Sequence, residues 1–178
     1  MSGDFKSYGT AGVGGLGLIG GSMAKTIKER TGIRVFGYDR DEEVLGSALR
    51  EGSIDEALSK DNIGKCDILL IALYPRAAVD FISDHKELIS EGTMVIDLCG
   101  VKRAVIKPLM PVLSEAAFDF IGGHPMAGTE KTGYYNSRAG LFDGASMILV
   151  PVKNSEESLE KAESFFMSLG FGRTVRTD

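Results

Sequence analysis

The fold of this chain is decided by the stretch Gly15-Leu16-Gly17-Leu18-Ile19-Gly20. It fits the pattern G-x-G-x-x-G, in which Gly15 would make a tight turn and Gly17 would let the backbone approach a pyrophosphate. Gly20 would let a helix pack closely on a strand. The amides of Leu18 and Ile19 would then point at the phosphates, helped by the positive end of the helix dipole. The stretch therefore predicts a dinucleotide-binding loop.

The segments on both sides of this loop support that prediction. Residues 9–14 would form the preceding strand, which we expect to be strained or thinly packed because it has few β-branched residues. Apolar spacing predicts a helix from about 19 to 30, and a short strand over 33–38 follows. That strand leads into Asp39, 24 residues after Gly15. Dinucleotide-binding domains carry a ribose-binding acid at about 20 residues from the loop.

Asp39 and its neighbour Arg40 bear on the choice of cofactor. Asp39 should accept hydrogen bonds from the adenosine ribose and repel a 2′-phosphate. Two like charges about 4 Å apart cost on the order of 4 kcal/mol at an effective dielectric constant of about 20. Arg40 could stack on adenine, or reach a 2′-phosphate if Asp39 turned away. We therefore expect NAD, with NADP as the less favoured alternative.

The rest of the chain alternates apolar runs of strand length with helical patterns. The predicted strands cover about 66–73, 93–98, 118–121, 146–150 and 171–175. The predicted helices cover about 41–49, 76–89, 102–113 and 156–168. This alternation predicts a Rossmann-type α/β fold with a doubly wound, mostly parallel sheet. We expect a single domain over residues 8–178, preceded by a disordered extension over 1–7.

Composition excludes several classes of protein. The 178 residues are 43% hydrophobic and 25% charged, as in ordinary globular domains. A net charge of −5 disfavours nucleic acid. No apolar run approaches the roughly 18 residues of a membrane span, and the N-terminus lacks a signal-peptide core. Cys66 and Cys99 lack a metal-binding spacing and suit a reducing compartment. We expect a cytoplasmic protein without a metal site.

Two histidines could serve as a proton acceptor, which hydride transfer from a carbinol requires. His85 lies among charged residues at a helix end, and we interpret it as solvated. His124 directly follows the predicted strand over 118–121, at the edge of the sheet where ligands bind. It could also be a turn residue that caps a backbone carbonyl. The glycines on both sides of His124 have no side chains that could cover its ring, which favours a ring that faces a cleft.

Four runs of the chain resemble the prephenate dehydrogenase family. They are residues 15–22, 37–39, 97–102 and, most specifically, Gly123-His124-Pro125-Met126-Ala127-Gly128-Thr129-Glu130. The resemblance spans about 13–175 and corresponds to the N-terminal NAD-binding domain of that family. It implies oxidative decarboxylation of prephenate to 4-hydroxyphenylpyruvate, a step of tyrosine biosynthesis in which hydride leaves substrate C4 for the nicotinamide.

The resemblance also implies roles for individual residues. His124 would accept the proton of the C4 hydroxyl. Thr129 and Glu130 would lie on the substrate side, with Glu130 in a polar network. A turn at the end of a strand would sit beside the cofactor, and its residues are Leu73, Tyr74 and Pro75.

The chain departs from the family pattern at two points. Gly100, at the cofactor side of the site, stands where the family has a serine that assists at the C4 hydroxyl. Losing one such donor costs roughly 10-fold to 1000-fold in rate. The family also carries an all-helical C-terminal domain, which forms the dimer and supplies an arginine to the substrate. This sequence lacks that domain, so we expect a homodimer or a missing helical domain as a partner. Lys102 could partly substitute for the arginine.

Three functions remain open at this point. The first is a dehydrogenase acting on prephenate or on its amino analogue arogenate. The second is an NAD-binding half-enzyme that has no turnover alone. The third is another small-molecule dehydrogenase, such as a 3-hydroxy acid enzyme, which would share the loop and Asp39 but does not predict the run over 123–130.

Overall fold

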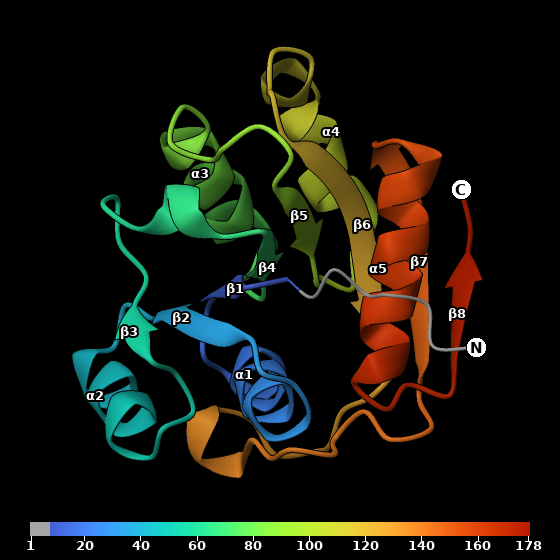
Figure 1. The fold of residues 1–178 in the computed structure, drawn as a ribbon. Coiled ribbons are helices and arrows are strands. Elements are labelled where there is room, and N and C mark those ends of the chain that lie inside the picture. The colour runs from blue at the N-terminus through green and yellow to red at the C-terminus, as the bar shows by residue number, and fades with distance from the viewer. Residues whose placement is uncertain (1–7) are drawn as a thin grey trace.

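The computed structural model describes residues 8–178, which form one eight-stranded sheet with helices on both faces (Figure 1). The strand order is β3-β2-β1-β4-β5-β6-β7-β8. Neighbouring described strands run parallel except β6 and β7, which are antiparallel. The predicted Rossmann-type, mostly parallel fold in a single domain is confirmed. The predicted extension over 1–7 lies outside the described residues.

The elements follow the predicted order closely. The strands are β1 (Thr10–Gly14), β2 (Arg34–Tyr38), β3 (Glu56–Ala57), β4 (Ile68–Ile71), β5 (Met94–Asp97), β6 (Asp119–Pro125), β7 (Ser146–Lys153) and β8 (Arg173–Arg176). The α-helices are α1 (Leu18–Arg30), α2 (Glu42–Arg50), α3 (Pro75–His85), α4 (Lys102–Leu113) and α5 (Glu156–Ser168). Two single 3₁₀ turns are η1 (Ile63–Lys65) and η2 (Tyr134–Asn136).

The differences from the predicted elements have local causes. β3 was not predicted, because two exposed residues carry no apolar pattern. Helix α3 ends four residues early, where the backbone amides of Leu88 and Ile89 turn back to the carbonyl of His85. Strand β6 continues four residues further than predicted, because β7 pairs with it antiparallel as far as Pro125.

The sheet separates two apolar cores. In β4, Ile68 and Leu70 face the core that contains α1, α2 and α5, whereas Leu69 and Ile71 face the core that contains α3 and α4. All four side chains are fully buried. The continuous apolar run of this strand therefore marks a strand covered on both faces, as predicted.

The prediction of a strained or thinly packed β1 is wrong. Thr10–Gly14 contains no residue with a left-handed backbone conformation, and all of it except Thr10 is buried. A Cβ on Gly12 would lie 2.6 Å from Leu69 Cδ1 and 3.0 Å from Cys66 Sγ. Glycine stands there because neighbouring side chains fill the space that a side chain would take.

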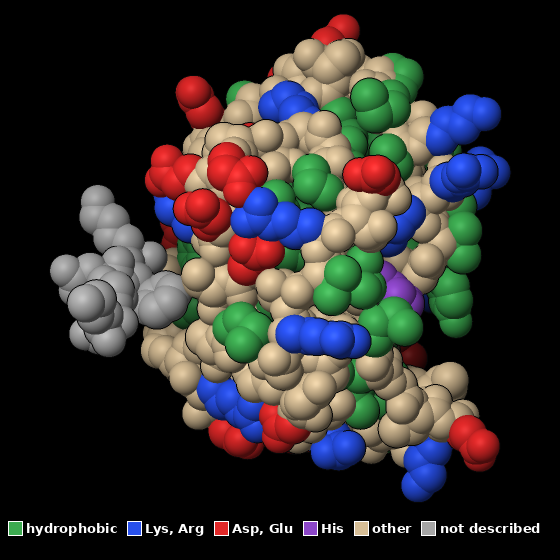
Figure 2. All heavy atoms as spheres, turned by 90° about the vertical axis from the view of Figure 1, so that its right-hand side faces the viewer, with side chains coloured by type: hydrophobic (Ala, Val, Ile, Leu, Met, Phe, Trp, Pro, Cys, Tyr) green, Lys and Arg blue, Asp and Glu red, His purple; other side chains and the backbone are tan. Residues whose placement is uncertain are grey.

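The surface carries no field of one sign on the face that Figure 2 shows, where acidic and basic side chains are intermixed. On this side of the molecule, Arg176 of β8 pairs with Glu156 and Glu163 of α5. No helix within residues 8–178 is long and apolar enough to cross a membrane. In the same part of the chain, no group of three or more His, Cys, Asp or Glu side chains could hold a metal ion.

Candidate functional site

The loop between β1 and α1 depends on two glycines. Gly15 has a φ of +90°, a left-handed conformation that favours glycine, and its amide donates to the carbonyl of Tyr38 over 2.7 Å. A Cβ on Gly20 would lie 1.7 Å from the carbonyl oxygen of Gly15. No side chain is possible at position 20 while the loop keeps this shape.

The first turn of α1 is open to an anion. Gly17 is the N-cap, no side chain caps the helix, and its first turn carries no acid. A Cβ on Gly17 would meet nothing within 4 Å. The first amides of a helix have no partner within the helix, and the positive end of its dipole lies there. This end of α1 therefore fits the pyrophosphate of a dinucleotide.

Asp39 lies just after β2 and is tied to the glycine loop. Its Oδ2 accepts from the amide of Leu16 over 2.8 Å, and its Oδ1 accepts from the amide of Asp41 over 2.9 Å. The carboxylate is half-buried, and each oxygen has a further lone pair for a hydroxyl group. Arg40, beside it, is exposed. Two backbone amides thus hold the carboxylate in place beside the loop.

The turn between β4 and α3 lies against the same loop. A Cβ on Gly15 would come within 2.9 Å of Leu73 Cδ2. Tyr74, the N-cap of α3, is 87% exposed, and Pro75 is the first residue of that helix. The carbonyl of Leu73 accepts from the thiol of Cys99 over 2.8 Å, which joins this turn to the one after β5.

A buried ion pair stands at the end of β5. Asp97 is fully buried, and its Oδ2 lies 2.5 Å from Nζ of Lys102, the first residue of α4. The ammonium group also donates to the carbonyl of Asp97 over 3.3 Å. Lys102 was predicted to lie on the substrate side, but the structure directs its charge to Asp97. The signal that could have revealed this pair is a single carboxylate at the end of an apolar strand.

Burial opposes both charges of this pair. It raises the pKa of the Asp97 carboxyl, although Lys102 acts in the other direction. It also lowers the pKa of the Lys102 ammonium group, against the attraction of Asp97. Such a pair costs desolvation energy that the mutual attraction has to offset.

His124 belongs to β6 and pairs with Ile148 of β7, so the prediction that it follows the strand is wrong. The ring is half-buried, and its Nδ1 is buried without a hydrogen-bond partner among the described residues. Burial lowers the pKa of the imidazole, and the Lys102 ammonium lowers it further against the opposing effect of Asp97. The ring is therefore neutral near pH 7.

The glycines before His124 serve close packing, which differs from the expected uncovered cleft. A Cβ on Gly122 would lie 3.1 Å from Cδ of Lys102. One on Gly123 would lie 2.9 Å from the carbonyl oxygen of Asp97. These two positions let the ion pair and the strand end approach His124. Gly100 faces the imidazole from the turn before α4.

Thr129 and Glu130 lie in the exposed loop after β6. The hydroxyl of Thr129 accepts from the amide of Lys131 and donates to its carbonyl, both over 3.2 Å. Within residues 8–178, no hydrogen bond joins either side chain to His124.

His85 is held more firmly than a solvated residue. Its ring stacks on Phe81 with the centroids 4.4 Å apart, and its Nδ1 lies 2.8 Å from the Phe81 carbonyl oxygen. It is half-buried at the end of α3, far in the chain from the glycine loop.

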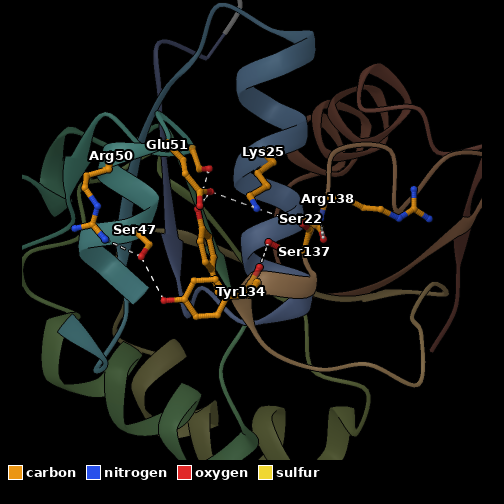
Figure 3. A network of polar contacts seen from close by, with 10 residues as sticks. Ser22, Lys25, Ser47, Arg50, Glu51, Tyr134, Ser137 and Arg138 are labelled. Carbon is orange, nitrogen blue, oxygen red and sulfur yellow. Dashed lines mark hydrogen bonds and ion pairs between the residues drawn. The ribbon is translucent and has the colours of Figure 1, made fainter. Parts of the chain in front are cut away.

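Residues 133–138 form a strap that lies over α1 and α2 and that no sequence motif indicated (Figure 3). Tyr134 is 2% exposed, and its hydroxyl lies 2.8 Å from Glu51 Oε2 and 2.9 Å from Ser53 Oγ. Nζ of Lys25 lies 4.4 Å from the centroid of the Tyr134 ring. The Glu51 carboxylate and the Lys25 ammonium group thus both contact the buried side chain of Tyr134.

The strap also contacts the beginning of α1 directly. A Cβ on Gly21 would lie 2.8 Å from Ser137 Oγ, so the glycine admits the strap. The amide of Arg138 donates to Ser22 Oγ over 3.1 Å. The loop that follows the histidine strand therefore braces the helix whose N-terminus faces the expected phosphates.

The doubly wound sheet, the glycine loop and Asp39 define a dinucleotide-binding domain of the Rossmann type. The family model described as "Prephenate dehydrogenase, nucleotide-binding domain" matches residues 23–174. The chain belongs to this family.

Individual relatives agree with the family match. A prephenate dehydrogenase of Bacillus subtilis is 30% identical over 155 residues, which are 84% of this chain and 42% of that protein. The crystal structure of Synechocystis arogenate dehydrogenase matches with a TM-score of 0.86 at 28% identity. The match covers 94% of this chain and 59% of the Synechocystis chain. Prephenate dehydrogenase from A. aeolicus in complex with hydroxyphenyl propionate and NAD+ has a TM-score of 0.87 at 27% identity, covering 98% and 62%.

This chain thus spans about 42% of the curated Bacillus relative.

Proposed function

We propose that this chain is the NAD-binding part of a prephenate dehydrogenase and that it carries the proton acceptor, His124. The observation that carries the proposal is the position of His124 on the edge of the sheet where the glycine loop also lies. Because β6 runs parallel to β5, its carboxyl end reaches the edge formed by β1, β4 and β5. Ligands of doubly wound folds bind along that edge.

NAD is the cofactor that the loop and Asp39 support best. The open N-terminus of α1 would hold the pyrophosphate, and the free lone pairs of Asp39 would accept from the ribose hydroxyls. The same carboxylate would repel the 2′-phosphate of NADP, because both groups are negatively charged. The hydrogen bonds that it accepts from two backbone amides would keep it from turning away. Leu73, Tyr74 and Pro75 would flank the bound dinucleotide, and Gly100 would face its nicotinamide end.

The bound nicotinamide would supply the hydride acceptor, and the residues of this chain would handle the proton. Neutral His124 takes the proton from the C4 hydroxyl of the substrate while hydride leaves C4, so C4 becomes a carbonyl carbon. The ring carboxylate then leaves as carbon dioxide, and its bonding electrons make the ring aromatic. The phenolate oxygen takes a proton back, which gives 4-hydroxyphenylpyruvate and places the reaction in tyrosine biosynthesis.

Thr129 and Glu130 would lie on the substrate side, in the exposed loop that follows the strand of His124. Arogenate, the amino analogue of prephenate, fits the same chemistry at C4 and remains an alternative substrate. Free, buried Cys66 and Cys99 support a reducing location such as the cytoplasm.

An NAD-binding part without turnover of its own is the second candidate. Two observations favour it. The ammonium of Lys102 is engaged by Asp97, and Thr129 and Glu130 make no hydrogen bond to His124 in the part of the chain that is described. A dianionic substrate would then need cations from a helical domain or from a second copy of the chain.

Mixing the 178-residue chain with NAD and prephenate, and following NADH absorbance, separates the two candidates. The first predicts NADH from the parent chain, and His124→Gln should reduce the rate by about 10²–10⁴-fold while NAD affinity is unchanged. NADH formation that survives this substitution would contradict the role of His124. NAD binding without any NADH from folded protein supports the second candidate, and arogenate in place of prephenate tests the alternative substrate.

The pH dependence of kcat/KM gives a further check. His124 accepts a proton only when neutral, and its surroundings lower its pKa from the usual value of about 6.5. The rate should therefore stay high below pH 6.5 and fall only as the imidazole becomes protonated. An acid limb centred above pH 6.5 would contradict this assignment.

A further inference from the structure

Gly100 and the ring of His124 lie against each other between the β5–α4 turn and β6. A Cβ on Gly100 would lie 3.2 Å from Cε1 of the imidazole, 3.6 Å from Nδ1 and 3.9 Å from Nε2. A contact of 3.2 Å is tight, so the ring would have to move by a few tenths of an ångström to admit a side chain. Any side chain at position 100 would therefore crowd the imidazole ring in its present position.

The two ring nitrogens of His124 differ in their surroundings. Nδ1 is buried and has no hydrogen-bond partner among residues 8–178, whereas Nε2 is not among the buried unpartnered atoms. Most buried polar side-chain atoms have a partner. In a neutral histidine, the bond made by one nitrogen usually decides which nitrogen carries the proton. Here no described residue makes that decision.

Two charged groups influence the ring from the elements around it. Lys102 at the start of α4 disfavours a proton on the imidazole, and Asp97 at the end of β5 favours it. Because they carry opposite charges, their effects on the pKa of the ring oppose one another. Neither accepts from the ring nor donates to it, and they leave the tautomer unfixed.

We propose that Gly100 is a positioning residue for His124: its missing side chain lets the ring pack with Nδ1 unpaired, so that the ligand bound at Nε2 decides the tautomer. A ring of this kind presents a lone pair to a hydroxyl donor or an N–H group to a carbonyl acceptor, without breaking a bond inside the protein. The catalytic meaning of this arrangement rests on the proposed function, whereas the arrangement itself does not.

The test is nitrogen and proton NMR of the imidazoles in the 178-residue chain without cofactor or substrate. It compares the parent with Gly100→Ser and Gly100→Ala. The alanine variant adds the crowding Cβ alone, and serine adds the same Cβ with a hydroxyl group within reach of Nδ1. His85, whose Nδ1 is bonded to the Phe81 carbonyl, is an internal reference and should not change.

We expect averaged nitrogen shifts for neutral His124 in the parent and in Gly100→Ala, which indicate a mixture of tautomers. Gly100→Ser should give one tautomer. Its titration midpoint should lie about 0.5–1 pH unit above that of Gly100→Ala, because the oxygen accepts from Nδ1–H of the charged ring.

A single tautomer of His124 in the parent would overturn the proposal, and this measurement needs no variant. Identical His124 shifts and midpoints in the serine and alanine variants would overturn it as well. Neither outcome depends on turnover, so a failure of the proposed enzymatic function stays distinguishable from a failure of this inference.

Discussion

The cofactor half of the sheet edge and the histidine half are built differently. Backbone hydrogen bonds hold Gly15 and Asp39 in place, and the open end of α1 has the shape and polarity that an anion needs. Near His124, the charges of Asp97 and Lys102 are paired with each other, and Nδ1 of the ring has no hydrogen-bond partner in the described structure. The first half is preorganised for its ligand, whereas the second depends on groups that approach it.

This difference shows what a backbone can fix and what side chains leave open. Turns and helix ends place amides without help from other parts of a protein. A substrate pocket needs converging side chains, and Thr129 and Glu130 are exposed residues of a loop. Four substitutions, two of them with a matched control, test whether the two halves behave as differently as their construction indicates.

Lys102→Met should have the largest effect on stability, because it leaves the buried Asp97 carboxylate without its cation. Removing one partner of a buried ion pair costs about 3–5 kcal/mol. Urea unfolding at pH 7 measures this loss. Burial raises the pKa of Asp97 above its unfolded value, so the neutral carboxyl favours the folded state and part of the stability should return by pH 5.

Arg103→Met is the matched control, because Arg103 is exposed on the same turn of α4. It should change the free energy of unfolding by less than about 0.5 kcal/mol. Equal effects of the two substitutions would show that the ion pair does not organise the histidine half.

Gly20→Ala should come next, with about 1–3 kcal/mol lost through the overlap with the carbonyl oxygen of Gly15. NAD affinity should disappear together with the shape of the loop. Gly17→Ala separates the two effects, because its Cβ meets no protein atom and would project toward the phosphates. It should lower NAD affinity by about tenfold or more, which is 1.4 kcal/mol, with little change in thermal stability.

Calorimetric titration with NAD and thermal unfolding of both glycine variants check this pair. A Gly20→Ala protein that binds NAD as the parent does would show that the cofactor half tolerates a different loop.

Tyr134→Phe should have the smallest effect. It removes a hydroxyl that contacts Glu51 and Ser53 and keeps the buried ring, so it should cost about 1–2 kcal/mol. If the strap braces α1, NAD affinity should fall slightly as well. Tyr135→Phe is the control: its hydroxyl lies 3.3 Å from Ser47 Oγ on an exposed residue, so its loss should change both quantities by less than about 0.5 kcal/mol. A fall in affinity without a loss of stability would contradict a bracing role.

Local patterns were sufficient to predict most of the fold. Helices α1, α4 and α5 lie within one residue of their predicted ranges, because apolar spacing acts within a few turns. The end of β6 was not predictable, since an antiparallel partner more than 20 residues away sets it. The packed glycines of β1 and β6 were misread for the same reason: their neighbours come from segments distant in the sequence, including other strands and α4.

The site follows the same division. Gly15, Gly20 and Asp39 lie where their spacing predicts, because parallel pairing of β1 with β2 brings the glycine loop and Asp39 to the same edge of the sheet. The Asp97–Lys102 pair and the strap depend on which charges and rings are brought together by folding, and a motif does not encode that. A lone acid at the end of the apolar strand Met94–Asp97 was one signal for the pair, and the run over 97–102 that resembles the family contains both of its residues.

The most direct test of the account is a calorimetric titration of the folded 178-residue chain with NAD and with NADP. A cofactor half that is complete within this chain should bind NAD without any other domain, and NADP should bind at least about tenfold more weakly because Asp39 repels its 2′-phosphate. Folded protein that binds neither nucleotide, or that binds NADP more tightly than NAD, would contradict it.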